Sequence, residues 1–153
     1  MADYSLPLSR IPDYGRAVPL ERADADLPGA FVVRIHQSVP GAIALPDGGH
    51  AVAYGDACTH MACTLHDRRA RGSGGILTQY RAAGADQPQE LLCGPCPAHG
   101  TTFDLGRRGL VVLGPATEHL PQLALALDSA GTTLSADTWL QGDPRSDRWP
   151  EAT

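Results

Sequence analysis

Residues 91–104 have the sequence LLCGPCPAHGTTFD, and residues 58–63 have the sequence CTHMAC. Each stretch holds one cysteine and one histidine close together: Cys58 with His60, and Cys96 with His99. Glycines and prolines around the second pair allow or impose unusual backbone paths, so such a loop can direct two side chains at one point. Two cysteines and two histidines form a donor set for tetrahedral zinc or for an iron–sulfur cluster of the mixed kind. The two stretches together therefore predict a metal centre.

On either side of these stretches the chain is a series of short apolar runs separated by turn residues. It contains 17 glycines and 13 prolines among 153 residues, which is expected for a protein rich in strands and loops. The sequences PDGG at 46–49 and SAG at 129–131 are hairpin signals between neighbouring runs. Leucines alternate with alanines over 123–127, as in a strand buried more deeply on one face. We expect strands at Phe31–Ile35, Gly41–Leu45, Ala51–Tyr54, Ile76–Tyr80, Leu91–Cys93, Leu110–Leu113, Leu123–Leu127 and Thr132–Trp139.

Many short strands joined by Gly and Pro turns predict an all-β fold, an antiparallel sandwich or barrel. By its length the chain 1–153 is expected to be one domain with a single core of ordinary size. Residues 1–29 are punctuated by prolines and are expected to be irregular, and Arg68–Gln89 is expected to be an inserted loop or hairpin. The polar tail from Gly142 is expected to lie on the surface or to fray.

The composition argues against several classes of function. Asp and Glu number 17 and Lys and Arg number 12, for a formal charge of −5, and the longest basic stretch is Arg68–Arg71, so no nucleic-acid partner is expected. No apolar run approaches the roughly 20 residues that cross a bilayer, and residues 1–30 contain none long enough for a signal peptide. Taken as it stands, the chain predicts a soluble, cytoplasmic protein. A chain from which an export signal had been removed, or one whose partner carries the signal, would look the same and would be periplasmic.

The spacing of the metal-binding pairs favours iron over zinc. Zinc fingers and ribbons usually space their first ligands as Cys-x2–4-Cys, whereas here the pairs are Cys-x-His and Cys-x2-His. At this point the chain resembles the Rieske family, through residues 58–63 and 96–104. Gly114–Thr117 is similar to the proline loop that covers the cluster in that family. The resemblance extends over about residues 50–128, and a structural zinc protein remains the non-redox alternative.

The resemblance implies a two-iron two-sulfur cluster and one-electron transfer. One iron would be held by Cys58 and Cys96 and the other by His60 and His99, with Pro115 in the covering loop. Neutral imidazoles in place of two thiolates leave such a cluster less negative, which raises its reduction potential. The implied fold is an antiparallel base with a small cluster-binding subdomain at about residues 56–117.

The chain also departs from the family pattern. Many high-potential members tie their two cluster loops with a disulfide; Cys63 occupies one half of that position, but Ala98 occupies the other. Cys93 is a candidate partner for Cys63, and two free thiols are the alternative. Thr101 keeps the hydroxyl of a serine that donates a hydrogen bond toward the cluster, whereas Phe103 replaces a tyrosine that does the same. The insert at 68–89 lengthens the gap between the two motifs.

A finer resemblance involves the run Ala116-Thr117-Glu118-His119-Leu120-Pro121-Gln122 and the pair Phe103-Asp104, which look like the small subunit of arsenite oxidase and related molybdenum enzymes. It implies a large molybdopterin-containing partner subunit and an electron-transfer partner such as a cytochrome, with no catalytic residues in this chain. The redox alternatives are a soluble Rieske ferredoxin of a ring-hydroxylating dioxygenase and a cytochrome bc Rieske subunit. The remaining histidines are expected to be surface or structural residues: His36, His50, His66 and His119.

Overall fold

The computed structural model describes residues 2–14, 16–55, 77–80, 90–93, 102–113 and 120–141. The regular structure of these residues consists of strands and two short 3-10 helices, η1 (Leu8–Arg10) and η2 (Leu105–Arg107). All strand pairs found there are antiparallel, as the all-β prediction requires. The strands are β1 (Tyr4–Pro7), β2 (Ala17–Pro19), β3 (Glu21–Arg22), β4 (Ala30–Ile35), β5 (Ile43–Ala44), β6 (His50–Gly55), β7 (Leu77–Tyr80), β8 (Glu90–Cys93), β9 (Thr102–Asp104), β10 (Leu110–Leu113), β11 (Gln122–Leu123), β12 (Ala126–Leu127), β13 (Thr133–Ala136) and β14 (Trp139–Gln141).

The central sheet has the strand order β14-β11-β6-β4-β2, and β5 also pairs with β6. Its two longest strands, β4 and β6, pair from Ala30 opposite Gly55 to Ile35 opposite His50. Both strands are almost entirely buried, because each of their faces is covered by another layer. Such strands read as nearly continuous apolar runs, which is why the sequence predicted them well.

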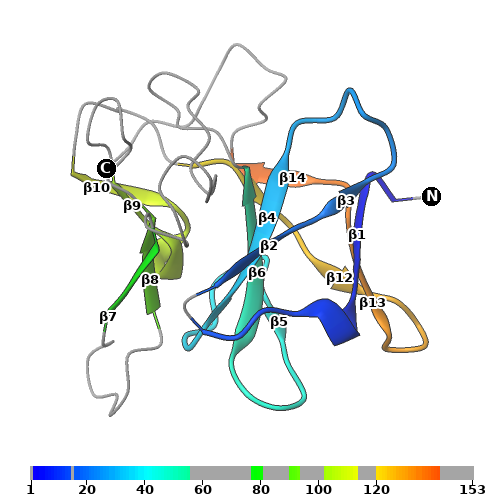
Figure 1. Cartoon of the computed structure of the whole chain (residues 1–153), viewed down its shortest axis with the longest axis horizontal. Helices are drawn as coiled ribbons and strands as arrows, with labels where there is room; N and C mark the ends of the chain where they lie inside the picture. The colour runs from blue at the N-terminus through cyan, green and yellow to red at the C-terminus, as the bar shows by residue number, and fades with distance from the viewer. Residues whose placement is uncertain are drawn as a thin grey trace.

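Side chains that alternate along β4 and β6 divide between two separate cores. Phe31 and Tyr54 belong to the core that the central sheet shares with Phe103, Leu105 and Leu120. The intervening residues of the two strands belong to the other core, together with side chains of β1 and β13: Ala30, Val32, Ala51 and Ala53. In Figure 1 the sheet of β7 to β10 accordingly lies on one side of the central sheet, and β1, β12 and β13 lie on the other.

The outer sheet has the order β12-β13-β1-β3. A two-stranded ribbon connects it to the central sheet: β11 and β14 form its part in the central sheet, and β12 and β13 form its part in the outer sheet. We predicted single strands at Leu123–Leu127 and Thr132–Trp139, and both predictions are wrong in this respect. Each run is divided in two: β11 pairs with β14 in the central sheet, whereas β12 pairs with β13 in the outer sheet. Because the ribbon crosses between layers, Leu123 and Leu125 are buried but Leu127 is 40% exposed.

The N-terminal segment is more regular than expected. The proline-rich residues 1–29 contain β1, β2 and β3, which pair with β13, β4 and β1 respectively. Prolines are tolerated there because Pro7 and Pro19 stand at strand ends. The predicted strand Gly41–Leu45 is reduced to Ile43–Ala44, since Gly41 has a φ of 87° that a strand does not permit.

The turns were predicted correctly. Residues 46–49 join β5 to β6, with the Leu45 amide donating to the Gly49 carbonyl at 3.0 Å. Residues 129–131 join β12 to β13, where the Gly131 amide donates to the Asp128 carbonyl at 3.0 Å. Gly and polar residues favour such turns for local reasons, which explains why the sequence identifies them.

Within the predicted subdomain at 56–117, the described strands form one small sheet with the order β10-β9-β8-β7. The stretch that we expected to be an inserted loop or hairpin, 68–89, contains β7, which pairs along its whole length with β8. Strand β9, which follows the second motif, was not predicted because Thr102–Asp104 is short and has only one large apolar residue.

Candidate functional site

Most of the residues predicted to form the site lie outside the described part of the chain: Cys58, His60, Cys96, His99, Thr101, Pro115 and Cys63. Of Cys93 the structure gives the backbone in β8, and it describes Phe103 in full. The tail from Gly142 is likewise outside the described residues. What the structure supplies is the framework on which the two motifs and the proline loop begin and end.

At one end of its strands, the small sheet carries ends of all three segments that contain the predicted site. Cys93, before the second motif, pairs with Phe103, and Thr102, after that motif, pairs with Leu113. Leu113 is the last residue before the proline loop, and Leu77, the first described residue after the first motif, pairs with Cys93. We call this row of strand ends, formed by Leu77, Cys93, Thr102 and Leu113, the motif end of the small sheet. Each segment that holds predicted site residues thus has at least one end there.

The other ends of two of these segments also meet. Gly55 is the last described residue before the first motif, and Leu120 is the first after the proline loop. The Gly55 amide donates a hydrogen bond to the carbonyl of Pro121, the next residue, at 2.9 Å. Segments 56–76 and 114–119 therefore both connect this meeting point to the motif end, where Leu77 and Leu113 lie on the two outer strands of the small sheet.

Phe103 lies in the apolar layer between the small sheet and the central sheet. Its side chain is fully buried in a cluster that includes Phe31, Tyr54, Leu105 and Leu120. Its backbone pairs with Cys93 on one side and with Val111 on the other. Phe103 therefore links the motif end to the base through packing, and an aromatic ring contributes about 1.5–3 kcal/mol when fully buried.

The chain reverses direction after Phe103 through η2. The Asp104 carboxylate accepts a hydrogen bond from the Gly106 amide at 2.9 Å, and its carbonyl accepts one from the Gly109 amide at 2.9 Å. An Asp side chain that accepts from an amide two residues on stabilises a turn of this kind. Asp104 also lies 3.7 Å from the exposed Arg107, a contact of small energetic value. The pair Phe103-Asp104 thus couples a core residue to a turn residue.

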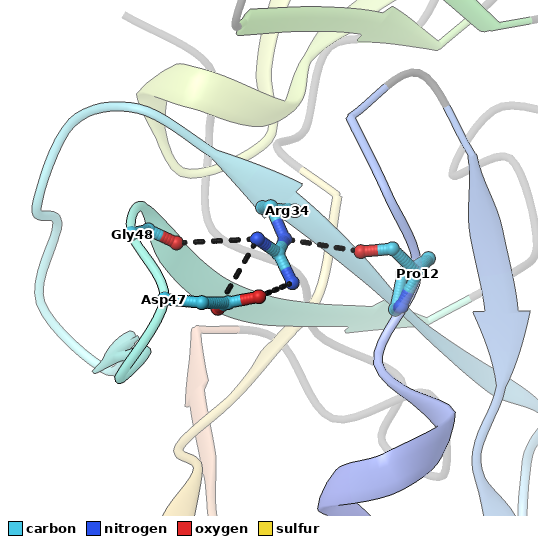
Figure 2. A network of polar contacts seen from close by, with 4 residues as sticks. All are labelled: Pro12, Arg34, Asp47 and Gly48. Atoms are coloured by element: carbon cyan, nitrogen blue, oxygen red, sulfur yellow. Dashed lines mark hydrogen bonds and ion pairs between the residues drawn. The ribbon is translucent and has the colours of Figure 1, made fainter.

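A second polar arrangement lies elsewhere, around Arg34 (Figure 2). Its guanidinium donates to the Pro12 and Gly48 carbonyls at 3.1 and 3.4 Å and pairs with the Asp47 carboxylate at 3.3 Å. It also lies 5.5 Å from the centre of the Tyr14 ring. A hollow of about 490 Å³ beside it is lined by Leu8, Ser9, Ile11, Asp13, Arg34, Leu45, Pro46 and Asp47. Arg34 is opposite Ala51, near the end of β4 and β6 that is remote from Gly55. These contacts tie three chain segments together at the far end of the sheet from the first motif.

A comparison with known families identifies the domain and its cofactor. The model of the Rieske [2Fe-2S] domain matches residues 21–124. The chain belongs to the Rieske [2Fe-2S] domain family. It therefore carries a Rieske-type [2Fe-2S] cluster and transfers electrons, and the structural zinc interpretation is set aside.

Individual relatives of this Rieske domain include subunits of larger enzymes. The chain is 42% identical over 74 residues to the iodate reductase subunit IdrB of Denitromonas iodatirespirans, a match that covers 48% of this chain and 31% of that protein. It is 30% identical over 93 residues to the cytochrome bc1 complex Rieske iron-sulfur subunit of Corynebacterium glutamicum, covering 61% of this chain and 18% of that one. The chain thus spans about a third, or less, of the length of these relatives. The soluble domain of Rieske protein II from Sulfolobus acidocaldarius matches with a TM-score of 0.48 and 20% identity, over 85% of this chain and 73% of that chain.

Two residues of this Rieske domain that matter to its framework were not singled out from the sequence. Tyr54 was predicted only as the end of a strand, and no prediction was made for Gly109. A tyrosine four positions before Cys58 and a glycine just before the Leu110–Leu113 run were the signals available.

In the described ranges no three His, Cys, Asp or Glu side chains are grouped as a metal site would need. No helix among the described residues has the length and apolar character to cross a membrane.

Proposed function

We propose that Cys58, His60, Cys96 and His99 hold the cluster, with the two thiolates on one iron and the two imidazoles on the other. The donor chemistry fits, because a Rieske centre requires two cysteines and two histidines. Each motif supplies one residue of each kind. When bound, the cluster would supply a site that takes up and releases one electron at a time.

The lengths of chain from the described framework support this ligand set. Cys96 is three residues after Cys93, and His99 is three residues before Thr102, so each starts within about 11 Å of the motif end. Cys58 is three residues after Gly55 and has the same reach, about 11 Å, from the other meeting point. Cys96 and His99 are therefore anchored close to the small sheet, and Cys58 is anchored close to the end of β6, with His60 two residues further along the chain.

Electron paramagnetic resonance of the dithionite-reduced protein tests the ligand set. We expect the signature of a mixed histidine–cysteine cluster, and we expect His60→Cys and His99→Cys to alter or abolish it. His50→Asn is the matched control, because His50 stands at the end of β6 remote from Gly55 and should leave the signal unchanged. A wild-type signal that survives both cysteine substitutions would overturn the assignment.

The domain also has a proposed place in a larger enzyme: it would be the electron-transfer subunit beside a large, molybdopterin-containing subunit that moves an oxygen atom to or from an oxyanion. The observation that carries this proposal is the 42% identity to an iodate reductase subunit over nearly half the chain. The run at 116–122, which resembles the small subunit of arsenite oxidase, also supports it. This chain would not itself be catalytic.

Oxygen-atom transfer explains why such a subunit is needed. Removing an oxygen atom from an oxyanion consumes a pair of electrons, and adding one releases a pair. The large subunit therefore needs a carrier that delivers or removes single electrons in succession, from or to a partner such as a cytochrome. Iodate reduction would draw electrons through this chain toward the large subunit, whereas arsenite oxidation would send them in the opposite direction.

Purification of this chain from native cells tests the proposed partner subunit, and the visible absorbance of the cluster then tests the direction of electron transfer. We expect a stable heterocomplex with a large molybdenum-containing chain. In an iodate reductase, iodate should reoxidise the reduced cluster; in an arsenite oxidase, arsenite should reduce the oxidised one. A lone protein that supports a ring-hydroxylating dioxygenase would instead establish the ferredoxin alternative and refute this proposal.

A respiratory cytochrome bc1 role is the second candidate, because relatives of that name are 30% identical over 61% of the chain. Two residues argue against it. Ala98 stands where many high-potential Rieske proteins have a disulfide cysteine, and Phe103 stands where they have tyrosine. Isolation of the chain in a complex with cytochromes that oxidises quinol would favour this role over the molybdenum enzyme.

A further inference from the structure

Three chain segments that flank the predicted site are joined to one another in pairs by hydrogen bonds. The Tyr54 hydroxyl donates to the carbonyl of Leu105 at 2.5 Å. The amide of Gly55 donates to the carbonyl of Pro121, and the amide of Leu120 donates to the carbonyl of Gly109, each at 2.9 Å. Each pair of segments has its own bond, so the three bonds form a closed ring. We call these residues, 54–55, 105–109 and 120–121, the junction.

Each segment of the junction adjoins a different part of the predicted site. Residues 54–55 directly precede the segment with Cys58 and His60. Residues 105–109 follow β9, which itself follows the segment with Cys96 and His99. Residues 120–121 follow the proline loop. A shift of one junction segment against another would therefore be transmitted to one site loop and not to the next.

The environment of the junction makes it rigid. Tyr54, Leu105 and Leu120 are fully buried members of one apolar cluster. A hydrogen bond is stronger in such surroundings than in water, and a buried hydroxyl without its partner is costly. Tyr54 is also held by its backbone, which pairs with Phe31 on one side and Gln122 on the other. The Tyr54 ring thus holds η2 at a fixed position relative to β6.

Gly109 permits the third bond of the ring. Its φ is 74°, a conformation that residues with a Cβ rarely adopt. A Cβ placed there would lie 2.8 Å from the Cβ of Leu120 and 3.0 Å from its carbonyl oxygen. Leu120 would have to move, and with it the end of the proline loop. Glycine is therefore required at position 109 for two reasons: the positive φ, and the close approach of Leu120.

We propose that Tyr54 and Gly109 are positioning residues for the cluster: through the junction they set the relative placement of the loops that carry its ligands and its cover. This inference rests on the proposed ligand set, because the two motifs matter only if both hold the cluster. A cluster whose ligands come from two separate segments is sensitive to their relative position. The junction and the motif end are the two described places where these segments are joined, and the junction joins all three through hydrogen bonds outside the small sheet's own pairing.

Tyr54→Phe tests the inference, because it removes one hydroxyl and leaves the ring. We expect broader electron paramagnetic resonance lines and a shifted midpoint potential, since the two motifs are held less uniformly. We also expect the cluster to be lost to an iron chelator faster, by about 2-fold to 13-fold if the bond is worth its usual net free energy. The matched control is Tyr4→Phe: Tyr4 belongs to the other core, and its hydroxyl donates to the Pro28 carbonyl at 2.6 Å in a part-buried hydrogen bond.

Gly109→Ala provides a second variant, with Gly131→Ala as its control. Gly131 has nearly the same φ, 72°, but no atom lies within 4 Å of the place its Cβ would take. Both substitutions impose backbone strain, and only Gly109→Ala displaces Leu120. We expect the spectroscopic change in Gly109→Ala alone. If that variant does not fold, Tyr54→Phe still tests the proposal.

The outcomes separate the inference from the proposed function beneath it. If His60→Cys and His99→Cys leave the wild-type spectrum unchanged, the ligand set is wrong. If they change it, but Tyr54→Phe has the line widths, potential and chelation rate of Tyr4→Phe, the ligand set stands and the positioning role is refuted. A difference confined to Tyr54→Phe and Gly109→Ala supports the positioning role.

Discussion

Phe103 stands where the family pattern has a tyrosine, and its side chain is buried in the core. Phe103→Tyr restores the hydroxyl that the family pattern places near a cluster sulfur. A donor there stabilises the reduced state, which carries one more negative charge. A hydrogen bond is worth roughly 0.5–1.5 kcal/mol, and about 1.4 kcal/mol corresponds to about 59 mV for one electron. We therefore expect the midpoint potential to rise by tens of millivolts in a redox titration.

The burial of Phe103 supplies the control for that measurement. Its ring is fully enclosed by apolar side chains, so a hydroxyl without a partner would cost about 1–3 kcal/mol of stability. Phe31→Tyr adds a hydroxyl to the same apolar cluster from β4 and should lower stability without raising the potential. If the new hydroxyl of Phe103→Tyr is seen within hydrogen-bonding distance of a sulfur and the potential does not rise, this electrostatic account is wrong.

Asp128 provides a prediction about pH. Its carboxylate accepts hydrogen bonds from the amides of Thr132 and Thr133, at 2.8 and 3.2 Å, and these bonds lower its pKa from the usual 3.8. A group whose pKa is lower in the folded state stabilises the fold above its unfolded-state pKa. This stabilisation diminishes as the pH falls below about 3.8 and is lost once the pH is below the folded-state pKa.

Asp128→Asn should remove that dependence. We expect the difference in free energy of unfolding between wild type and Asp128→Asn to be constant from neutral pH down to about 4, and to shrink at lower pH. Urea titrations of both proteins across this range provide the measurement. A difference that stays constant down to strongly acid pH would show that the carboxylate charge does not stabilise the turn.

Among the elements, β4 illustrates how a charged side chain can replace an apolar one in a buried strand. Arg34 faces the same side of β4 as Ala30 and Val32, which belong to the core shared with β1 and β13. At Arg34 this side is covered by residues 11–14 and the turn at 46–49 (Figure 2). Its hydrogen bonds to two backbone carbonyls join these segments to the sheet. An arginine is suited to this position because its planar guanidinium has several donors in fixed directions.

Arg34→Met keeps the aliphatic stem and removes those donors. We expect the free energy of unfolding to fall by about 1–3 kcal/mol, because the Pro12 and Gly48 carbonyls lose a partner. We expect the visible spectrum of the cluster to be unchanged, since this end of β4 is remote from Gly55. Denaturant titration and absorbance measure the two effects. A spectral change would mean that the two ends of the central sheet are coupled.

On the scale of the whole molecule, the three layers do not depend equally on the cluster. The outer sheet and the central sheet enclose a core of their own, with twelve buried apolar residues among those described. Among the side chains that the structure describes, Phe103 of the small sheet and Leu105 of η2 belong to the other core. All three segments that contain the predicted site begin or end on this small sheet. Its order should therefore depend on the metal.

Removal of the cluster with a chelator under reducing conditions should expose this difference. We expect the backbone amides of β7 to β10 to lose protection from hydrogen exchange, while those of β1, β4, β6 and β13 keep theirs. The holoprotein is the reference for every amide. Uniform loss of protection would mean that the cluster stabilises the whole fold, and no loss would mean that the small sheet is stable without metal.

The sequence by itself determined the all-β class, the turns at 46–49 and 129–131, the long buried strands and the Rieske family motifs. These are local properties: a turn depends on the residues within it, a strand buried on both faces is apolar throughout, and a Cys–His pair is recognised by spacing alone. Sequence and family together therefore indicate which cluster the protein carries.

Only the tertiary structure decided which sheet each strand joins and what lies around the motifs. The division of the runs at 123–127 and 132–139 between two sheets depends on partners distant in the chain. The bond between Tyr54 and Leu105 joins residues 51 positions apart, and the need for glycine at 109 arises from Leu120. Such contacts leave no local pattern, because they depend on how the layers pack after the strands have formed. The framework that holds the site is therefore a property of the folded molecule.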